Sequence, residues 1–269
     1  MFRTACLAIS AIAVLSAAPA AADHNDLDTV LADARRDNDR ARDVYRNPKE
    51  TLEFFGIEGD MTVVEMAPGG GWYTRILLPL VAEDGGYIAG NYEPSTFGSR
   101  NQRLVTWPET FKAATEEAYP GVSIQTFTYE TGGAAEIGPV ADAVLFFRAL
   151  HALVGRDRID AVLADAMSIL KPGGVVGVVQ HRAMDDAPDD YANGSKGYLR
   201  QADVVAAFEK AGFELVKSSD VNANAKDPAN WPGGVWTLPP ANRGPEERRD
   251  EFLAIGESNR MTLLFRKPE

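Results

Sequence analysis

The stretch VVEMAPGGGWYT, Val63–Thr74, joins an apolar run to three consecutive glycines and then to two aromatic residues. An apolar run that ends in glycines is typical of a buried strand that leads through a tight loop into a helix. Loops of this kind lie at the edge of a sheet and often receive the charged end of a cofactor. The rest of the chain decides which fold this loop belongs to and which cofactor suits it.

Strands and helices alternate along most of the chain. We expect strands over about 61–66, 86–91, 122–129, 141–147, 174–180, 213–219 and 260–267. We expect helices over about 72–82, 96–118 with an interruption at Pro108, 156–170 and 199–211. Short apolar strands separated by helices predict an α/β fold whose largely parallel sheet is covered on both faces.

The segment between the last two strands, residues 220–258, has no helix pattern of the crossover type. It is rich in Pro, Gly and Asn, and it contains Trp231 and Trp236. A loop of this length inside a compact domain is usually functional or disordered, and two tryptophans argue against simple disorder. We predict a lid-like insertion over the site, with a packed structural insertion as the alternative.

The N-terminal part of the chain predicts two further segments. Residues 1–22 have Arg3 before an apolar run and an Ala-x-Ala site before Asp23, which predicts a signal peptide. The only cysteine, Cys6, lies inside it, so the mature chain would carry none. Residues 23–49 predict a helical extension, with a charged helix over about 25–45. We therefore expect an exported, periplasmic protein without membrane insertion after signal removal, whose residues 50–269 form one domain.

Charge and strand patterns exclude some partners. The formal net charge of −12 repels nucleic acid and anionic lipid. The fourth strand runs into Phe147-Arg148-Ala149 and lacks the Asp/Asn-Pro-Pro-Tyr/Phe pattern of enzymes that modify the amino groups of nucleic-acid bases. We expect a small-molecule substrate and no nucleic-acid partner. The oligomeric state does not follow from these patterns.

Three kinds of cofactor loop compete for the glycine stretch. A phosphate-binding Walker loop requires a lysine after the glycines, and none follows. A dinucleotide loop requires G-x-G-x-x-G, and Thr74 stands at the third glycine position. The remaining pattern is an acid before spaced small residues, Glu65-x-Ala67-x-Gly69-x-Gly71. Glycine allows a ligand to contact the backbone, and a carboxylate suits a cofactor that carries an ammonium and a sulfonium group.

This pattern resembles motif I of the class I S-adenosylmethionine-dependent methyltransferases, with Ala67 in place of the first glycine. LKPGG at 170–174, AAFEKAGFELV at 206–216 and RMTLLFRKP at 260–268 extend the resemblance over roughly residues 50–269. It is similar in particular to a group of predicted exported bacterial methyltransferases. The resemblance implies a seven-stranded Rossmann-like sheet of order 3-2-1-4-5-7-6 with strand 7 antiparallel. It also implies S-adenosylmethionine as cofactor, held by Glu65, Ala67, Gly69, Gly70 and Gly71, with Asn91 and Glu93 as candidates for the ribose because the usual strand-two acid is absent.

Candidate catalytic residues lie where the fourth and fifth strands end. Arg148 and His151 follow strand four, and His181 follows strand five. Ligands of open α/β sheets bind at the carboxyl ends of the strands, and in the implied order these two strands are neighbours. A neutral imidazole there could accept a proton from an acceptor hydroxyl or amine. Local structural roles are the alternative for each histidine.

Two other functions remain open at this point. One is a non-catalytic exported ligand-binding protein that keeps the methyltransferase fold. The other is a metal-assisted enzyme in which His151 and His181 bind a metal with Glu65 or Asp185. No local H-x-x-x-H spacing supports the second function, so we predict no metal site.

Overall fold

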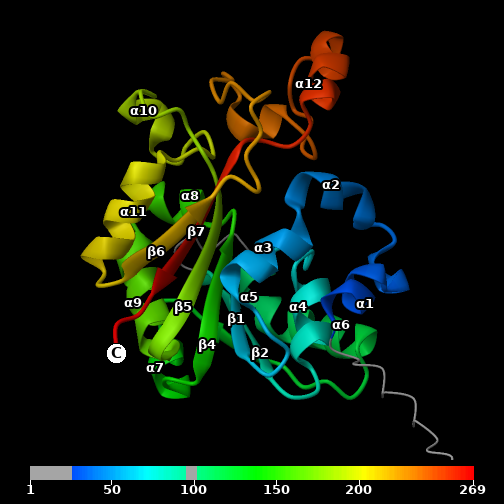
Figure 1. Cartoon of the computed structure of the whole chain (residues 1–269), viewed down its shortest axis with the longest axis vertical. Helices are drawn as coiled ribbons and strands as arrows, with labels where there is room; N and C mark the ends of the chain where they lie inside the picture. Colours follow the sequence, from blue (N-terminus) through cyan, green and yellow to red (C-terminus); the bar gives the residue numbers. More distant parts are fainter. Residues whose placement is uncertain (1–25, 95–101) are drawn as a thin grey trace, which may run out of the picture.

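The computed structural model describes residues 26–94 and 102–269 (Figure 1). The predicted signal peptide at 1–22 lies outside these ranges. The centre of the fold is a seven-stranded sheet of order β3-β2-β1-β4-β5-β7-β6. Its strands are β1 (Thr62–Met66), β2 (Gly86–Asn91), β3 (Gln125–Thr128), β4 (Ala141–Phe147), β5 (Leu170–His181), β6 (Glu214–Ser219) and β7 (Arg260–Arg266). Strand β7 runs antiparallel to both of its neighbours, and β1 to β5 pair in parallel, as the sequence predicts.

Helices cover both faces of the sheet. One apolar core includes side chains of α7 (Gly133–Ile137), α8 (Leu150–Val154), α9 (Ile159–Ile169) and α11 (Gln201–Lys210). The other core includes side chains of α1 (Leu27–Ala32), α3 (Pro48–Phe55), α4 (Thr74–Val81) and α6 (Trp107–Ala118). The remaining helices are the short α2 (Asp43–Arg46), α5 (Gln102–Val105), α10 (Asp189–Ala192) and α12 (Arg249–Ile255).

The expected charged helix over 25–45 is wrong as a single element. The structure has α1, two 3-10 turns at Ala34–Arg36 and Arg40–Arg42, and then α2. Asp33 interrupts the helix with an extended backbone, and its side chain accepts a hydrogen bond from the Arg35 amide. Short acidic side chains bond to nearby amides and so compete with a continuous helix. After the break, Arg42 and Arg46 both pair with Glu257, shortly before β7.

The carboxyl edge of the sheet carries most of the polar side chains discussed below. Because β7 is antiparallel, it begins at this edge, and Arg260 pairs in register with His181 at the end of β5. The segment after β6 leaves and returns at the same edge, and α12 lies at the upper end of Figure 1, above α2 in this view. It contains 3-10 turns at Gly234–Thr237 and Glu246–Arg248, and Trp231, Leu238 and Phe252 form a small core with residues of 183–198.

No helix in the two described ranges is both long and apolar enough to cross a membrane.

Candidate functional site

The glycine loop forms a backbone cradle at the end of β1. Ala67, Gly69 and Gly71 have φ values of 54°, 61° and 73°, which lie in the left-handed region that favours glycine. Gly69 and Gly70 are exposed, and a Cβ atom added to Gly70 would meet no atom within 4 Å. The loop therefore presents bare backbone to open space, which fits the close approach that a cofactor's amino-acid part requires.

Glu65, the predicted cofactor carboxylate, is 2% exposed and holds the elements around the loop. Its Oε2 atom accepts hydrogen bonds from the Tyr87 hydroxyl at 2.6 Å and from the Thr74 hydroxyl at 2.7 Å. These bonds tie β1 to β2 and to the first turn of α4. Burial raises the pKa of Glu65 to about 7, although the two hydrogen bonds oppose the shift.

The N-terminal segment supports the same loop from outside. The Arg75 guanidinium donates through Nη1 to the Gly70 carbonyl at 2.9 Å and through Nη2 to Asp39 at 2.8 Å. The indole of Trp72 donates to the Asp39 carbonyl at 3.3 Å. Arg75 thus connects Asp39, which precedes the domain, to the backbone of Gly70 in the glycine loop.

The two ribose candidates occupy different surroundings. Asn91 ends β2, is 7% exposed, and follows Gly90, whose carbonyl accepts the Ala67 amide at 2.8 Å. Asn91 is therefore next to the glycine loop. Glu93 is partly exposed and borders a groove of about 950 Å³ that also exposes Thr126 and Thr128 of the edge strand β3.

The structure brings His151 and His181 together. Their ring centroids lie 5.7 Å apart, and His181 Nδ1 lies 2.5 Å from the Ser258 hydroxyl. Trp236 packs its ring 6.1 Å from His151, so residues after β6 reach both histidines. Arg148 follows β4 with a φ of 59° and donates its amide to the Val179 carbonyl.

Both imidazoles are held neutral. Burial lowers the pKa of His151 to about 4, with Arg148 adding to the decrease and Gln180 opposing it. Burial, Arg148 and the neighbouring His151 lower the pKa of His181 well below its ordinary value. Neutral histidines can accept a hydrogen bond or a proton, but the positive charge of Arg148 makes protonation costly.

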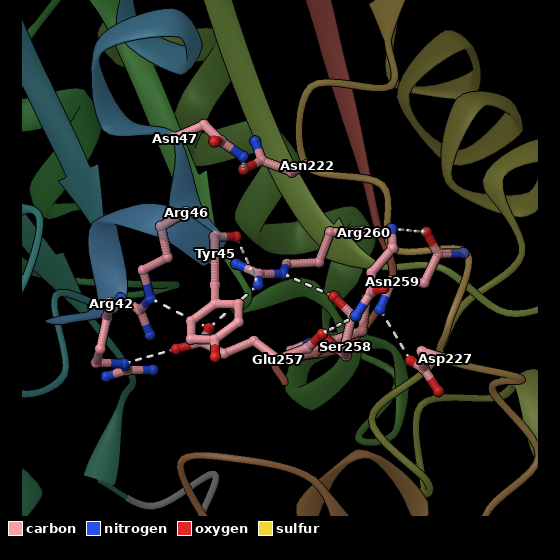
Figure 2. A network of polar contacts seen from close by, with 12 residues as sticks. Arg42, Tyr45, Arg46, Asn47, Asn222, Asp227, Glu257, Ser258, Asn259 and Arg260 are labelled. Carbon is pink, nitrogen blue, oxygen red and sulfur yellow. Dashed lines mark hydrogen bonds and ion pairs between the residues drawn. The ribbon is translucent and has the colours of Figure 1, made fainter. Parts of the chain in front are cut away.

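Sequence patterns missed a group of charged residues beside these histidines: Arg42, Arg46, Glu257 and Arg260. Figure 2 shows Arg42 and Arg46 from the N-terminal segment and Arg260 from β7 meeting at Glu257. Arg42 and Arg46 stand four residues apart in a charged stretch that usually indicates a solvated helix face. The one sequence feature that could have indicated this group is Arg260, a charged residue at the start of an apolar strand.

The described residues contain no group of three or more His, Cys, Asp or Glu side chains placed to hold a metal ion. Glu65 bonds to Tyr87 and Thr74, and Asp185 is exposed.

No protein-family model matches this sequence, and no curated protein matches it. Solved structures share the fold. The complex between the Trm112 methyltransferase activator of Haloferax volcanii and its methyltransferase partner matches with 13% identity and a TM-score of 0.52, over 91% of this chain and 97% of that chain. A protein from Galdieria sulphuraria, assigned as a sarcosine dimethylglycine methyltransferase, matches with 15% identity and a TM-score of 0.51, over 86% of this chain and 88% of that chain. A protein from Bacillus halodurans C-125, assigned as a methyltransferase, matches with 16% identity and a TM-score of 0.50, over 83% of this chain and all of that chain.

At such identities these matches concern the fold. The chain has the Rossmann-like methyltransferase fold, which confirms the predicted sheet order.

Proposed function

We propose that this protein transfers the methyl group of S-adenosylmethionine to a small-molecule acceptor at the carboxyl edge of the sheet. The observation that carries the proposal is the open backbone cradle of Ala67–Gly71, placed after β1 in a sheet of methyltransferase order. Methyltransferase-fold neighbours support the reaction class. Glu65, Asn91 and Glu93 remain predicted cofactor contacts.

The residues at the edge would supply positioning and hydrogen-bond acceptance. Bound S-adenosylmethionine supplies an electrophilic methyl group on a positively charged sulfur. Transfer requires the acceptor atom to be aligned with that methyl group, so orientation contributes most of the rate. His151 and His181 are neutral and their ring centroids lie 5.7 Å apart, so either can accept a hydrogen bond from the acceptor, whereas burial and the charge of Arg148 make both imidazoles weak bases. Arg148 would orient the acceptor.

Calorimetric titration of the mature chain tests the proposal. We expect S-adenosylmethionine and S-adenosylhomocysteine both to bind. Gly70→Asp should abolish binding without unfolding the chain, because the new side chain enters the space that no protein atom occupies. Ala164→Asp, at an exposed position of α9, is the matched control for an added carboxylate and should bind normally. A folded wild-type protein that binds neither ligand at millimolar concentration would falsify the methyltransferase assignment.

We also propose that the protein is exported to the periplasm, on the evidence of residues 1–22 alone. Expression of the full chain in a Gram-negative host, followed by N-terminal sequencing, should give a mature protein that starts at Asp23. A protein that stays in the cytosol with its first residues intact contradicts export.

A further inference from the structure

Four arginines from three distant parts of the chain meet at the carboxyl edge. Arg42 and Arg46 come from the N-terminal segment, Arg148 follows β4, and Arg260 opens β7. We call them the arginine cluster. Arg46 and Arg260 are each 2% exposed, whereas Arg148 is partly exposed.

Three members of the arginine cluster share a single carboxylate. Glu257, 4% exposed, lies 2.6 Å from Arg42 Nε, 3.3 Å from Arg46 Nε and 3.1 Å from Arg260 Nη2. The arginines hold the pKa of Glu257 below its ordinary value even though burial opposes this shift. Glu257 is therefore ionised and is already used by three of the four arginines.

The arginine cluster has more N–H donors than the described residues supply with hydrogen-bond acceptors. Arg42 Nη2 and Arg46 Nη2 are buried and have no hydrogen-bond partner in the described chain. Arg148 makes no side-chain hydrogen bond or ion pair with any residue of 26–94 or 102–269. Buried polar groups are normally satisfied, so unpaired buried guanidinium nitrogens indicate a missing acceptor.

The positive charges also repel one another. Burial lowers the pKa of Arg46 to about 10, with Arg42 and Arg260 adding to the decrease and Glu257 opposing it. Burial, Arg46 and Arg260 lower the pKa of Arg148 well below its ordinary value. Buried charges without a counter-charge destabilise a fold, and an anion that binds here would relieve the repulsion.

The arginine cluster adjoins the proposed site of chemistry. Arg260 pairs with His181 across β5 and β7, and Arg148 influences the charge states of both histidines. Tyr73, which follows the glycine loop, places its hydroxyl 3.5 Å from the Arg46 carbonyl and stacks on Phe147. The arginine cluster thus lies between the cofactor loop and the histidine pair.

Building on the methyl-transfer function proposed above, we propose that the acceptor is a small anion whose carboxylate or phosphate group binds Arg148 together with Arg42 and Arg46. The planar guanidinium fork matches both groups by paired hydrogen bonds. The pocket of about 190 Å³ that Glu257 and Arg260 line with Tyr45 contains none of these three arginines, so the anion would bind outside it. The anionic group would hold the methyl-accepting atom near His151 and His181.

Calorimetry with simple anions tests this proposal. The probes are inorganic phosphate and malonate, added to the mature chain with and without saturating S-adenosylhomocysteine, with chloride as the control anion. We expect at least one probe to bind in both conditions. Competition between the probe and S-adenosylhomocysteine would assign the arginine cluster to the cofactor's own carboxylate and overturn the proposal. Binding of S-adenosylhomocysteine without binding of either probe would also overturn it.

The same experiment separates this proposal from the proposed function. If a probe binds but S-adenosylhomocysteine does not, the proposed anion site is supported and the proposed methyl-transfer function is wrong.

Substitution of Arg148 distinguishes ligand binding from a structural role. Arg148→Gln should weaken probe binding at least about tenfold, the usual loss for one charged hydrogen bond. The unliganded variant should melt at the same temperature or higher, because Arg148 has no ion-pair partner to lose and repels its neighbours. Arg148→Lys, which keeps the charge but loses the fork, should bind with intermediate affinity.

Arg182→Gln is the matched control. Arg182 also lies at the carboxyl edge but pairs with Asp220 at 2.9 Å, outside the arginine cluster, so probe affinity should not change. If Arg148→Gln lowers the melting temperature and leaves probe affinity unchanged, Arg148 is structural and the anion site is wrong.

Discussion

At the scale of single residues, burial determines the protonation state of the site. Glu65 and His151 are both shifted toward their neutral forms, Glu65 upward to about 7 and His151 downward to about 4. Neither shift is visible in the sequence, because each depends on the packing around the side chain. The two shifts make opposite contributions to the pH dependence of stability.

His151 should make the protein less stable in acid. Its folded pKa of about 4 lies below the unfolded value of 6.5. Its contribution to the free energy of unfolding is therefore complete above pH 6.5 and is lost as pH falls through 4. The full effect amounts to at most about 3 kcal/mol. Urea denaturation between pH 4 and pH 7 should show a shallower acid loss for His151→Asn than for the wild type. Identical profiles would contradict a neutral His151 with a lowered pKa.

Glu65 should make the protein less stable as the pH rises, the opposite of the effect of His151. Its folded pKa of about 7 lies above the unfolded value of 4.5, so its contribution is complete below pH 4.5 and is lost as pH rises through 7. Glu65→Gln removes this loss. The variant should therefore gain stability relative to the wild type between pH 5 and pH 8, by up to about 3 kcal/mol, as measured by urea denaturation. A constant difference across this range would show that Glu65 is ionised throughout.

At the scale of elements, the segment between β6 and β7 has a core of its own. Trp231 is 5% exposed and donates its indole N–H to Asp227 at 2.8 Å, whereas Trp236 is partly exposed and packs against His151. The sequence predicts a lid over 220–258, and these contacts are consistent with a segment that both packs and covers the histidines. We retain the lid as a proposal.

The two tryptophans should respond differently to truncation. Trp231→Ala should cost about 3–5 kcal/mol of unfolding free energy, as expected for a buried tryptophan, and should expose the amides of 220–258 to hydrogen exchange. Trp236→Ala should cost less and should mainly raise the KM for the acceptor. Equal losses of stability with no change in KM would argue that the segment is only structural.

At the scale of the whole molecule, the N-terminal segment and the C-terminal part of the chain enclose the carboxyl edge together. Arg46 pairs with Glu257 across 211 positions of sequence, and Asp39 pairs with Arg75 beside the glycine loop. The segment before the domain is therefore part of the proposed site. Its removal would be expected to affect ligand binding as well as stability.

Asp39→Asn tests that connection. Loss of the charge frees Arg75 from its orientation toward the Gly70 carbonyl, so S-adenosylhomocysteine should bind several-fold more weakly while the melting temperature falls by only a few degrees. Asp37→Asn removes a neighbouring exposed pair with Arg40 and is the control that should leave affinity unchanged. Equal affinities of the two variants would show that the segment does not support the loop.

The sequence by itself determined the strands, the helices and the glycine loop, because apolar periodicity and turn residues act over a few positions. The order of the strands, and with it the neighbouring position of His151 and His181, followed from the resemblance to a known family. The tertiary structure alone decided that Arg42, Arg46 and Arg260 share Glu257, because this convergence depends on a broken N-terminal helix and on an antiparallel β7 that starts beside β5. Local sequence patterns do not determine which charged residues, far apart in the chain, become neighbours in the fold. In this protein, the proposal of an anionic substrate rests on those long-range contacts.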